Sequence, residues 1–391
     1  MTRLDAKWVR SPESRAVMAA LDGQGFFVGG CVRNALLDAP VADIDVATPL
    51  VPDAVISRLE DAGLKAVPTG IAHGTVTAIH EGAPVEVTTF RADVETDGRR
   101  AVVAFTTDIS VDAARRDFTM NALYADREGQ LVDPLGGLPD LRARRVRFIG
   151  AAEDRIREDY LRILRFFRFH AWYGADGIDA DGLAACAELA DGIEALARER
   201  IGWEIRKLLS APDPAPAVSS MAASGVLLRC LPGASTEFLP PLVHLEASAG
   251  IAPDWKRRLV VLGGAIAQTD LRLSNAEDKA LSAIRAAMSA DEPVDAAAYR
   301  HGDDAAVSAA LIRAASVAQS IPAGLLEEAR RGAAMRFPVT AGNLLSSGVP
   351  EGPEIGALLK QLEERWIGSG FSLGKDALLA GIPADPKDVP R

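Results

Sequence analysis

The chain has 391 residues, a length that predicts two to three domains of ordinary size. Apolar residues make up 48% and charged residues 25%, which is typical of a globular protein and excludes a disordered, collagen-like or disulfide-held chain. Lys and Arg number 43 against 54 Asp and Glu, so the net charge is -11. This charge excludes a basic coat over the whole surface but leaves room for a local basic face.

Cysteine usage and hydropathy both favour the cytoplasm. Cys31, Cys186 and Cys230 are far apart and form no C-x-x-C pair, which indicates a reducing compartment and argues against a zinc site. The first ten residues contain no apolar run of the kind found in signal peptides. The apolar stretch from Leu259 to Gln268 is far shorter than the roughly 20 residues of a membrane-spanning helix. We therefore expect a cytoplasmic protein that does not enter a membrane.

The first 150 residues alternate β-like runs with helical patterns, whereas the remainder is helical almost to its end. The expected elements are a strand over 26–28, a helix from 32, a strand over 43–47, a helix over 52–63, and strands over 76–80 and 85–91 that flank a hairpin turn. From residue 153 onward, Pro, Gly and Asp clusters separate successive helical patterns. Residues 383–391 contain three prolines and are expected to be loosely held. The pattern predicts an α+β region followed by an all-α region.

The most informative segment runs from Gly29 to Thr48 and begins with two glycines between a strand and a helix. Glycines at such a position let backbone N–H groups approach a phosphate closely, and the N-terminus of the helix adds a favourable dipole. Arg33 lies in the first helical turn, where its guanidinium would hold a triphosphate oxygen. Because glycine pairs are also common in surface turns, Gly29 and Gly30 gain their meaning from the residues that follow.

About ten residues later, Asp43 and Asp45 are separated by one residue on the expected strand. Side chains alternate along a strand, so both carboxylates face one side while Ile44 and Val46 face the core. Two carboxylates beside a phosphate cradle form a natural Mg²⁺ site. Glu86, in the run VEVTTFR, is either an exposed residue of a half-buried strand or a neighbour of these aspartates. We expect the second arrangement and a catalytic role, because two-metal nucleotidyl transfer uses several carboxylates.

Paired arginines and an aspartate come next, at Arg115, Arg116 and Asp117, ahead of an expected apolar helix that contains Asn121. Adjacent guanidinium groups are suited to gripping phosphate or ribose oxygens. A plain surface charge cluster at the start of a helix is the simpler alternative. We assign all three charged residues to nucleotide binding.

The segment from Glu158 to Phe169 predicts an amphipathic helix with a row of arginines opposite its apolar face. Arg162, Arg165 and Arg168 are three residues apart, and phenylalanines are interleaved with them. The wider stretch 142–168 has nine Arg against four Asp and Glu within an acidic protein. A face that only contacts solvent would not include large aromatic side chains, so we interpret this helix as a binding surface.

Asp159 and Arg162 are one turn apart in the expected helix, and together they complement the hydrogen-bonding edge of two bases. Cytosine and adenine each present an amino donor beside a ring-nitrogen acceptor, which suits a carboxylate and a guanidinium. Uracil and guanine present a carbonyl and a ring N–H instead, and would leave the protein groups unpaired or opposed. The pair predicts acceptance of CTP and ATP and rejection of UTP and GTP. The competing interpretation is that these residues only cap the helix and form a common surface Asp–Arg ion pair.

The motifs GGCVRN, DIDVAT, HGTVTA, VEVTTFR, RRDFTMNALY, DPLGG and EDYLRILRFFRF, in this order, resemble those of the class II CCA-adding enzymes and bacterial poly(A) polymerases. The resemblance covers about residues 25–210 and ends in ARERIGWEIRKLL. It implies a polymerase-β-like α+β head over 1–150, an all-α neck over 151–215 that selects the nucleotide, and a helical body and tail over 216–391 that bind tRNA.

Carried over by position, the resemblance implies that Gly30 and Arg33 bind the triphosphate and that Arg116 contacts the nucleotide. Arg165 and Arg168 would support nucleotide binding. The implied reaction adds C, C and A to tRNA 3′ ends from CTP and ATP, without a nucleic-acid template and with release of pyrophosphate. It needs no obligatory protein partner.

Alternatives stay open within this family and outside it. The HGTVT segment and the lack of a long basic C-terminal tail favour CCA addition over poly(A) synthesis, whereas specialised A-adding and CC-adding relatives are not distinguished. A non-catalytic tRNA-binding protein would be expected to lose the carboxylates that are present here. One position departs from the family, since Asn34 stands where an Asp often follows the motif arginine and a charge is thereby removed near the phosphate site.

Overall fold

The structure is a computed structural model, and it describes residues 3–97, 100–264 and 268–380. The chain forms two compact units, one made of Met1–Ala234 with Gly264–Arg272 and the other of Ser235–Gly263 with Leu273–Arg391. All of the predicted site residues belong to the first unit. The proline-rich stretch 383–391 lies outside the described residues.

Seven strands of the first unit form one sheet within the described ranges, in the order β3–β4–β5–β2–β1–β8–β9. They are β1 (Phe26–Val28), β2 (Asp45–Thr48), β3 (Lys65–Gly70), β4 (Thr75–His80), β5 (Ala83–Thr89), β8 (Tyr124–Ala125) and β9 (Leu131–Val132). β2 and β5 are parallel, whereas the other neighbours are antiparallel. A separate antiparallel pair consists of β6 (Arg91–Asp97) and β7 (Arg100–Phe105).

The predicted hairpin between residues 76 and 91 is confirmed. β4 and β5 pair in antiparallel register, and Glu81 and Gly82 form the turn with positive φ angles. Two residues of this conformation give a turn whose twist matches that of the paired strands. Along β5, Val85 and Val87 are buried and Glu86 is exposed, which is the alternation of a strand with one buried face.

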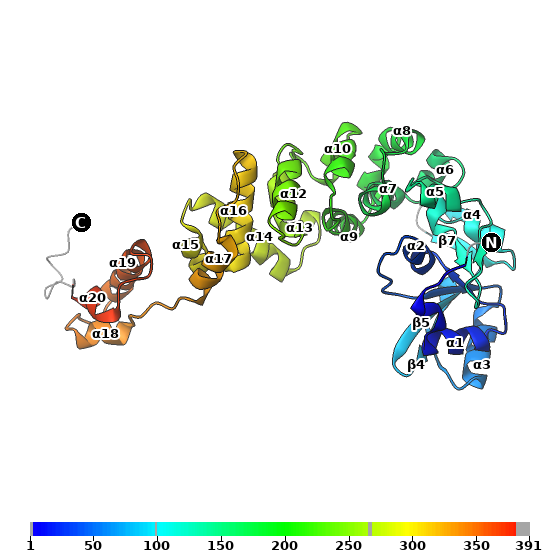
Figure 1. Cartoon of the computed structure of the whole chain (residues 1–391), viewed down its shortest axis with the longest axis horizontal. Helices are drawn as coiled ribbons and strands as arrows, with labels where there is room; N and C mark the ends of the chain where they lie inside the picture. The colour runs from blue at the N-terminus through cyan, green and yellow to red at the C-terminus, as the bar shows by residue number, and fades with distance from the viewer. Residues whose placement is uncertain (1–2, 98–99, 265–267, 381–391) are drawn as a thin grey trace. The chain divides into compact units, whose positions relative to one another are not determined.

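Helices α1 (Pro12–Ala20) and α3 (Pro52–Asp61) pack against each other and against β4 and β5 (Figure 1). Their side chains Val17 and Leu59 are fully buried. The helix predicted over 52–63 is confirmed, and it is followed by Gly63 with a φ of +75°. α1 and α3 therefore cover part of the sheet. The edge that carries Gly29 and Gly30 is surrounded by other elements.

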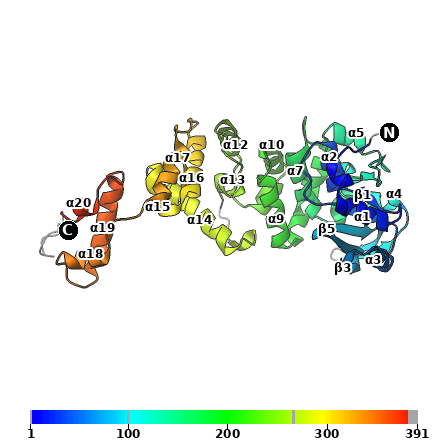
Figure 2. The same ribbon diagram turned by 60° about the horizontal axis from the view of Figure 1, so that its bottom comes forward.

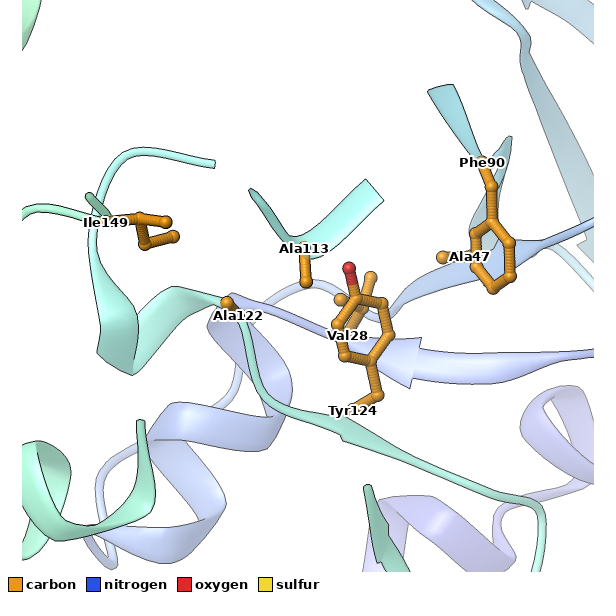
Figure 3. Packing of buried hydrophobic residues seen from close by; sticks show 7 residues of the cluster. All are labelled: Val28, Ala47, Phe90, Ala113, Ala122, Tyr124 and Ile149. Carbon is orange, nitrogen blue, oxygen red and sulfur yellow. The ribbon is translucent and has the colours of Figure 1, made fainter. Parts of the chain in front are cut away.

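A second cluster of buried side chains joins the strands to α4 (Ile109–Ala114). Figure 3 shows its members, which are Val28, Ala47, Phe90, Ala113, Ala122, Tyr124 and Ile149. The hydroxyl of Tyr124 donates a hydrogen bond to Asp112 of α4 at 2.7 Å, so its buried polar group is satisfied. Because β1, β2, β8 and α4 share this core, the chain segments at their ends are held at fixed positions.

After residue 150 the described chain is helical, which confirms the prediction of an α+β region followed by an all-α region. The remaining helices of the first unit are α2 (Gly30–Leu36), α5 (Leu138–Arg142), α6 (Ala152–Glu158), α7 (Leu161–Tyr173), α8 (Ala180–Glu188), α9 (Arg198–Leu209), α10 (Ala215–Ala223) and α11 (Val226–Cys230). α7 packs against α9 and α10 (Figure 2). The apolar face predicted for α7 is buried, since Ile163, Leu164 and Phe167 are at most 2% exposed.

The helix predicted after Asp117 is wrong. The chain makes a single 3₁₀ turn, Thr119–Asn121, and then enters the sheet as β8. Every residue from 117 to 125 is buried. A short apolar run that is enclosed on all sides has no polar face, so its periodicity does not distinguish a helix from a strand or turn.

The second unit is built from helices in its described residues. They are α12 (Leu239–Ser248), α13 (Trp255–Leu262), α14 (Asn275–Ser289), α15 (Val294–His301), α16 (Asp303–Ser316), α17 (Leu325–Ala334), α18 (Ala341–Ser346), α19 (Glu354–Gly368) and α20 (Lys375–Leu379). Leu344, Trp366 and Leu378 lie in the core of its C-terminal part. Across the described ranges of both units, no helix is long and apolar enough to cross a membrane.

Candidate functional site

The end of β1 and the start of β2 lie at the same edge of the sheet, because the strands are antiparallel with Phe27 opposite Val46. The residue after β1, Gly29, has a φ of +70°, a conformation that favours glycine. A Cβ atom at Gly29 would also come within 3.4 Å of a guanidinium nitrogen of Arg116. α2 begins at Gly30, so the predicted glycine turn between a strand and a helix is confirmed.

The carboxylates meet at this same edge. Asp45 is the first residue of β2, and the parallel register places it beside Glu86 of β5. Asp43 precedes β2, so the predicted strand start at residue 43 is wrong. Extending the register of β1 and β2 would place Gly30 opposite Asp43, and at Gly30 the chain has already turned into α2. Burial and the charge of Glu86 raise the pKa of Asp45 to about 6; Arg116 opposes this shift and Asp43 adds to it. Negative charge therefore accumulates where the three side chains approach one another.

Arg33 is held by side chains from distant parts of the first unit and is only 7% exposed. Its Nη1 donates to Asn121 Oδ1 at 2.6 Å, and its Nη2 donates to the Tyr173 hydroxyl at 2.8 Å. The oxygen of Asn34 accepts from Nε and Nη2 at 3.1 and 2.8 Å. These hydrogen-bond acceptors are all uncharged, so they fix the guanidinium while leaving its positive charge for an anion.

Arg115 and Arg116 are anchored by a buried carboxylate that the motif analysis missed. Asp112 of α4 is 1% exposed and pairs with Arg115 at 2.8 Å and with Arg116 at 3.0 Å. Arg116 Nε also donates to the Tyr124 hydroxyl at 3.1 Å. The sequence did hold a signal, because positions three and four residues apart lie on one helical face. The two arginines are therefore preorganised beside the glycine turn and are not a loose surface cluster.

Asp117 links the sheet region to α7. Its carboxylate accepts hydrogen bonds from Arg165 Nε at 2.8 Å, from Asn121 Nδ2 at 2.8 Å and from the backbone N–H of Phe118 at 2.9 Å. Burial alone would raise the pKa of Asp117, but Arg165 and the hydrogen bonds hold it below its usual range. Asp117 thus remains charged and fixes Arg165 at the pocket.

The helix predicted over 158–169 begins later than expected. α6 ends at Glu158, Asp159 is extended with φ -157° and ψ 105°, and α7 begins at Leu161. The Asp159 carboxylate accepts from the Leu161 N–H at 3.1 Å and from Arg200 of α9 at 2.7 Å. Short carboxylate side chains compete for backbone N–H groups and favour helix starts over interiors. Arg162 pairs with Glu158, so both the shared helix predicted for Asp159 and Arg162 and the simple ion pair between them are wrong.

The phenylalanines between the arginines of α7 have a structural explanation. Phe169 is 4% exposed, and its ring is approached by the guanidinium groups of Arg33 at 5.2 Å, Arg165 at 5.2 Å and Arg168 at 4.5 Å. Arg168 also pairs with the buried carboxylate of Glu204 on α9. Cations over an aromatic face are stabilised by the ring quadrupole, so Phe169 holds the arginine row in place.

These side chains enclose a pocket of about 380 Å³. Most of the predicted site residues line it, namely Gly29, Gly30, Arg33, Asp45, Arg115, Arg116, Asp117, Asp159, Arg162 and Arg165. The structure adds Asn121, Leu161, Phe169 and Arg200 to the lining, and it leaves Asp43, Glu86 and Arg168 outside. Arginines outnumber aspartates in this lining, which suits an anionic ligand such as a triphosphate.

The fold and this pocket define a nucleotidyltransferase of the poly(A) polymerase type. Residues 25–147 match the family model described as the poly A polymerase head domain, and residues 177–238 match one described as a probable RNA and SrmB-binding site of polymerase A. The second match covers α8 to α11, which follow α7 in the chain.

Relatives along nearly the whole chain narrow this class further. The mouse mitochondrial CCA tRNA nucleotidyltransferase 1 is 34% identical, with 90% of this chain and 85% of the relative covered. The CCA-adding enzyme of Streptococcus sanguinis is 33% identical, with 95% and 96% covered. The protein therefore belongs to the family of CCA-adding enzymes, the CCA tRNA nucleotidyltransferases.

Solved structures agree with this assignment. The CCA-adding enzyme of Bacillus stearothermophilus in complex with CTP has a TM-score of 0.71 and 27% identity, and the match covers 95% of this chain and 96% of that one. The Thermotoga maritima CCA-adding enzyme complexed with tRNA has a TM-score of 0.67 at 17% identity, with 97% of each chain covered, and shares the fold.

Proposed function

We propose that this protein adds C, C and A to the 3′ ends of tRNA, taking them from CTP and ATP without a nucleic-acid template and releasing pyrophosphate. One observation carries the proposal: the glycine turn after β1, the carboxylate that begins β2 and the arginine-rich start of α7 converge on one pocket. Relatives of the same name that extend over most of the chain support it.

The residues at the glycine turn hold the triphosphate. Gly29 and Gly30 line the pocket at the N-terminus of α2, and Arg33 and Arg116 line it beside them. Charged donors fixed by Asn34, Asn121 and Asp112 need no reorganisation when an anion arrives, and such preorganisation is the larger part of electrostatic catalysis. The 3′-hydroxyl of the tRNA would attack the α-phosphate in line with the departing pyrophosphate.

The carboxylate edge fits Mg²⁺. Asp43, Asp45 and Glu86 offer only oxygen ligands, and the pKa of Asp45 is raised first by burial and then by the charges of Glu86 and Asp43, a setting that a bound cation would relieve. Within the described residues no group of three His, Cys, Asp or Glu side chains is placed to hold a metal ion by itself, but Mg²⁺ is usually held by one or two carboxylates together with substrate phosphates. We assign Asp43 and Asp45 as ligands, with Glu86 in support. When bound, the ion would polarise the phosphate and favour ionisation of the 3′-hydroxyl.

Base selection is assigned to Asp159 and Arg162, which line one pocket although they do not share a helix. Arg162 donates to the backbone oxygens of Arg155 at 2.8 Å and Arg115 at 3.1 Å. Asp159 is held by Arg200. The carboxylate fixed in this way would accept a hydrogen bond from the amino group of cytosine or adenine, and the guanidinium would donate one to the ring nitrogen. The carbonyl and ring N–H of uracil and guanine would instead face groups of the same kind.

The same proposal divides the chain by role. Residues 1–150 bind the triphosphate, residues 151–215 select the base, and residues 216–391 bind the body of the tRNA. The site of action is the cytoplasm, which the reduced cysteines support, since Cys31, Cys186 and Cys230 are buried free thiols.

The deciding experiment incubates the protein with a tRNA that ends before CCA and sequences the added nucleotides. The expected products are one or two C residues with CTP alone and CCA with CTP and ATP together, with no product from UTP or GTP. Asp43→Ala, which removes an assigned ligand and leaves the helical regions intact, is the inactive control. Addition of A without C, of C only, or of a long run of A would replace CCA addition by the corresponding specialised reaction. Binding of tRNA without any addition would overturn the enzymatic proposal.

A further inference from the structure

One large aromatic side chain of α9 is exposed where packing gives no reason for it. α9 buries Ile201, Ile205 and Leu208. Trp203 lies among them in sequence but is 56% exposed. Apolar groups of this size cost free energy when they contact water, so an exposed tryptophan in a charged setting points to a binding surface.

The surroundings of Trp203 are those of a nucleic-acid contact. It lines a depression of about 520 Å³ together with Arg165, Arg200 and Arg206. The ammonium group of Lys207 lies 4.5 Å from the centre of its ring. Of the two acidic residues in the same depression, Glu204 binds Arg168 and lies 4.0 Å from Arg165, and Glu199 binds Arg272. Three arginines and Lys207 thus outnumber the two glutamates around the ring, and such a setting suits a base and its flanking phosphates.

This depression adjoins the nucleotide pocket. Leu161, Arg165 and Arg200 line both. Partial burial and the charge of Arg168 lower the pKa of Lys207, while Glu204 and the catalytic carboxylate of Asp43 act in the opposite direction. The aromatic ring therefore lies beside the incoming nucleotide and within electrostatic reach of the carboxylate edge.

We propose that Trp203 is the stacking platform for the 3′-terminal base of the tRNA that accepts the next nucleotide. This inference rests on the proposed function. In CCA addition the terminal base of the acceptor changes from one step to the next, so a contact that reads base edges would have to change as well. Stacking on an aromatic face tolerates any base, because every base has a π-face. Arg206 and Lys207 would hold the phosphates on either side.

The test compares Trp203→Ala and Trp203→Phe with the unchanged protein on a tRNA that ends before CCA and on one that ends in CC. Trp203→Ala should raise the KM for both tRNAs roughly 5- to 150-fold, the range for losing one stacked base, while the KM for CTP and ATP stays within about twofold. Trp203→Phe should restore most of the loss, because a smaller ring still stacks. Leu228→Ala on α11, a side chain 53% exposed in the same unit, is the matched control and should leave both KM values unchanged.

Intrinsic fluorescence gives a second readout. Either tRNA should quench the unchanged protein, and the quenching should be largely lost in Trp203→Phe. An active protein whose tRNA KM is unaffected by Trp203→Ala overturns the stacking assignment alone. So does a dimer that Trp203→Ala converts to a monomer, because the side chain would then serve contacts between copies. A protein that extends no tRNA overturns the proposed function and this inference with it.

Discussion

Asn34 shows how a single amide tunes the charge of the site. Its oxygen accepts from Arg33, and its Nδ2 donates to the backbone oxygen of Pro40 at 2.7 Å. An aspartate could keep the first contact but would lose the second and neutralise the guanidinium. The asparagine at this position therefore fits the local hydrogen bonds and preserves the positive charge.

Asn34→Asp should weaken triphosphate binding. If neutralisation weakens the contact of Arg33 with the phosphate by about 1 kcal/mol, the KM for CTP and ATP should rise roughly fivefold, with the KM for tRNA little changed. Steady-state kinetics with each nucleotide varied in turn measures this. Asn343→Asp on α18 adds the same charge at another helix and is the control. An unaltered nucleotide KM would show that Arg33 keeps its full effect beside a carboxylate.

Asp45 should make the metal-free protein lose stability as pH rises. Its folded pKa of about 6 lies above the value of about 4 in an unfolded chain, so the folded state binds the proton more tightly. The corresponding stability is present below pH 4 and is lost as pH rises through 6. Asp45→Asn cannot ionise, so its melting temperature in EDTA should exceed that of the unchanged protein by more at pH 7.5 than at pH 5.

Added Mg²⁺ supplies the control for this prediction. It should raise the melting temperature of the unchanged protein at pH 7.5 and have less effect on Asp45→Asn. A difference between the two proteins that does not grow with pH would contradict the raised pKa. Equal Mg²⁺ effects would remove Asp45 from the ligand set.

At the scale of elements, the junction between α6 and α7 determines which of its side chains line the pocket. The break at Asp159 turns its carboxylate toward Arg200 of α9 and into the pocket, where an uninterrupted helix would have placed it one turn below Arg162. The packing of α9 on α7 therefore completes the surface that we propose selects the base.

Asp159→Asn should relax base selection before it removes catalysis. The amide keeps an oxygen for the Leu161 N–H but also presents a donor, which meets the carbonyl of uracil or guanine. Loss of a charge-assisted hydrogen bond worth about 1.5–3 kcal/mol predicts a ratio of C and A to U and G incorporation that falls roughly 10- to 150-fold. All four nucleotides in competition on one tRNA measure this ratio. Asp179→Asn, which changes the N-cap of α8, should leave it unchanged; equal ratios in both variants would reduce Asp159 to a helix cap.

At the scale of the whole molecule, a protein of negative net charge has to bind the negatively charged tRNA through a local basic surface. Arg142, Arg144, Arg145 and Arg147 are exposed in the segment before α6 and belong to the basic stretch expected from the sequence. Phosphate contacts release counterions from the nucleic acid, so the affinity depends on salt even where the net charge of the protein is -11.

Affinity for tRNA should fall steeply with salt. Three phosphate contacts would lower it roughly 40-fold between 50 and 200 mM salt. Arg145→Gln should lower the slope of log affinity against log salt by about 1. Arg10→Gln, at a side chain 66% exposed near the N-terminus, is expected to leave the slope as it is. A flat affinity over this range would contradict a phosphate-led interface.

The second unit depends on a buried charge cluster. Glu246 of α12 pairs with Arg257 at 2.7 Å and with Arg258 at 2.7 Å, and all three side chains are at most 7% exposed. Glu246→Ala would leave buried arginines without this partner and should destabilise the unit by about 3–5 kcal/mol. Urea denaturation measures the change, and the exposed Glu237→Ala is the control. A loss below about 1 kcal/mol would mean that water reaches the arginines.

The sequence by itself determined most of the elements near the site and the residue types that gather there. Alternation predicted β5, helical periodicity predicted the buried face of α7, and the residues after β1 and in β2 indicated a phosphate cradle beside carboxylates. The predictions of β5 and of the buried face of α7 succeed because periodicity is a local property of the chain, and the phosphate cradle remains a prediction. The missed anchor Asp112 was also within reach, since it is three and four residues from the arginines that it holds.

Only the tertiary structure decided which partners these groups have. Arg33 meets Tyr173 across 140 residues of chain, and Asp159 meets Arg200 across 41. It also placed Trp203 beside the pocket and moved the start of α7 to Leu161. Such pairs depend on how helices pack against the sheet and against each other. A local pattern does not specify that packing, because the free energy of a side-chain contact is set by burial and geometry in the assembled unit.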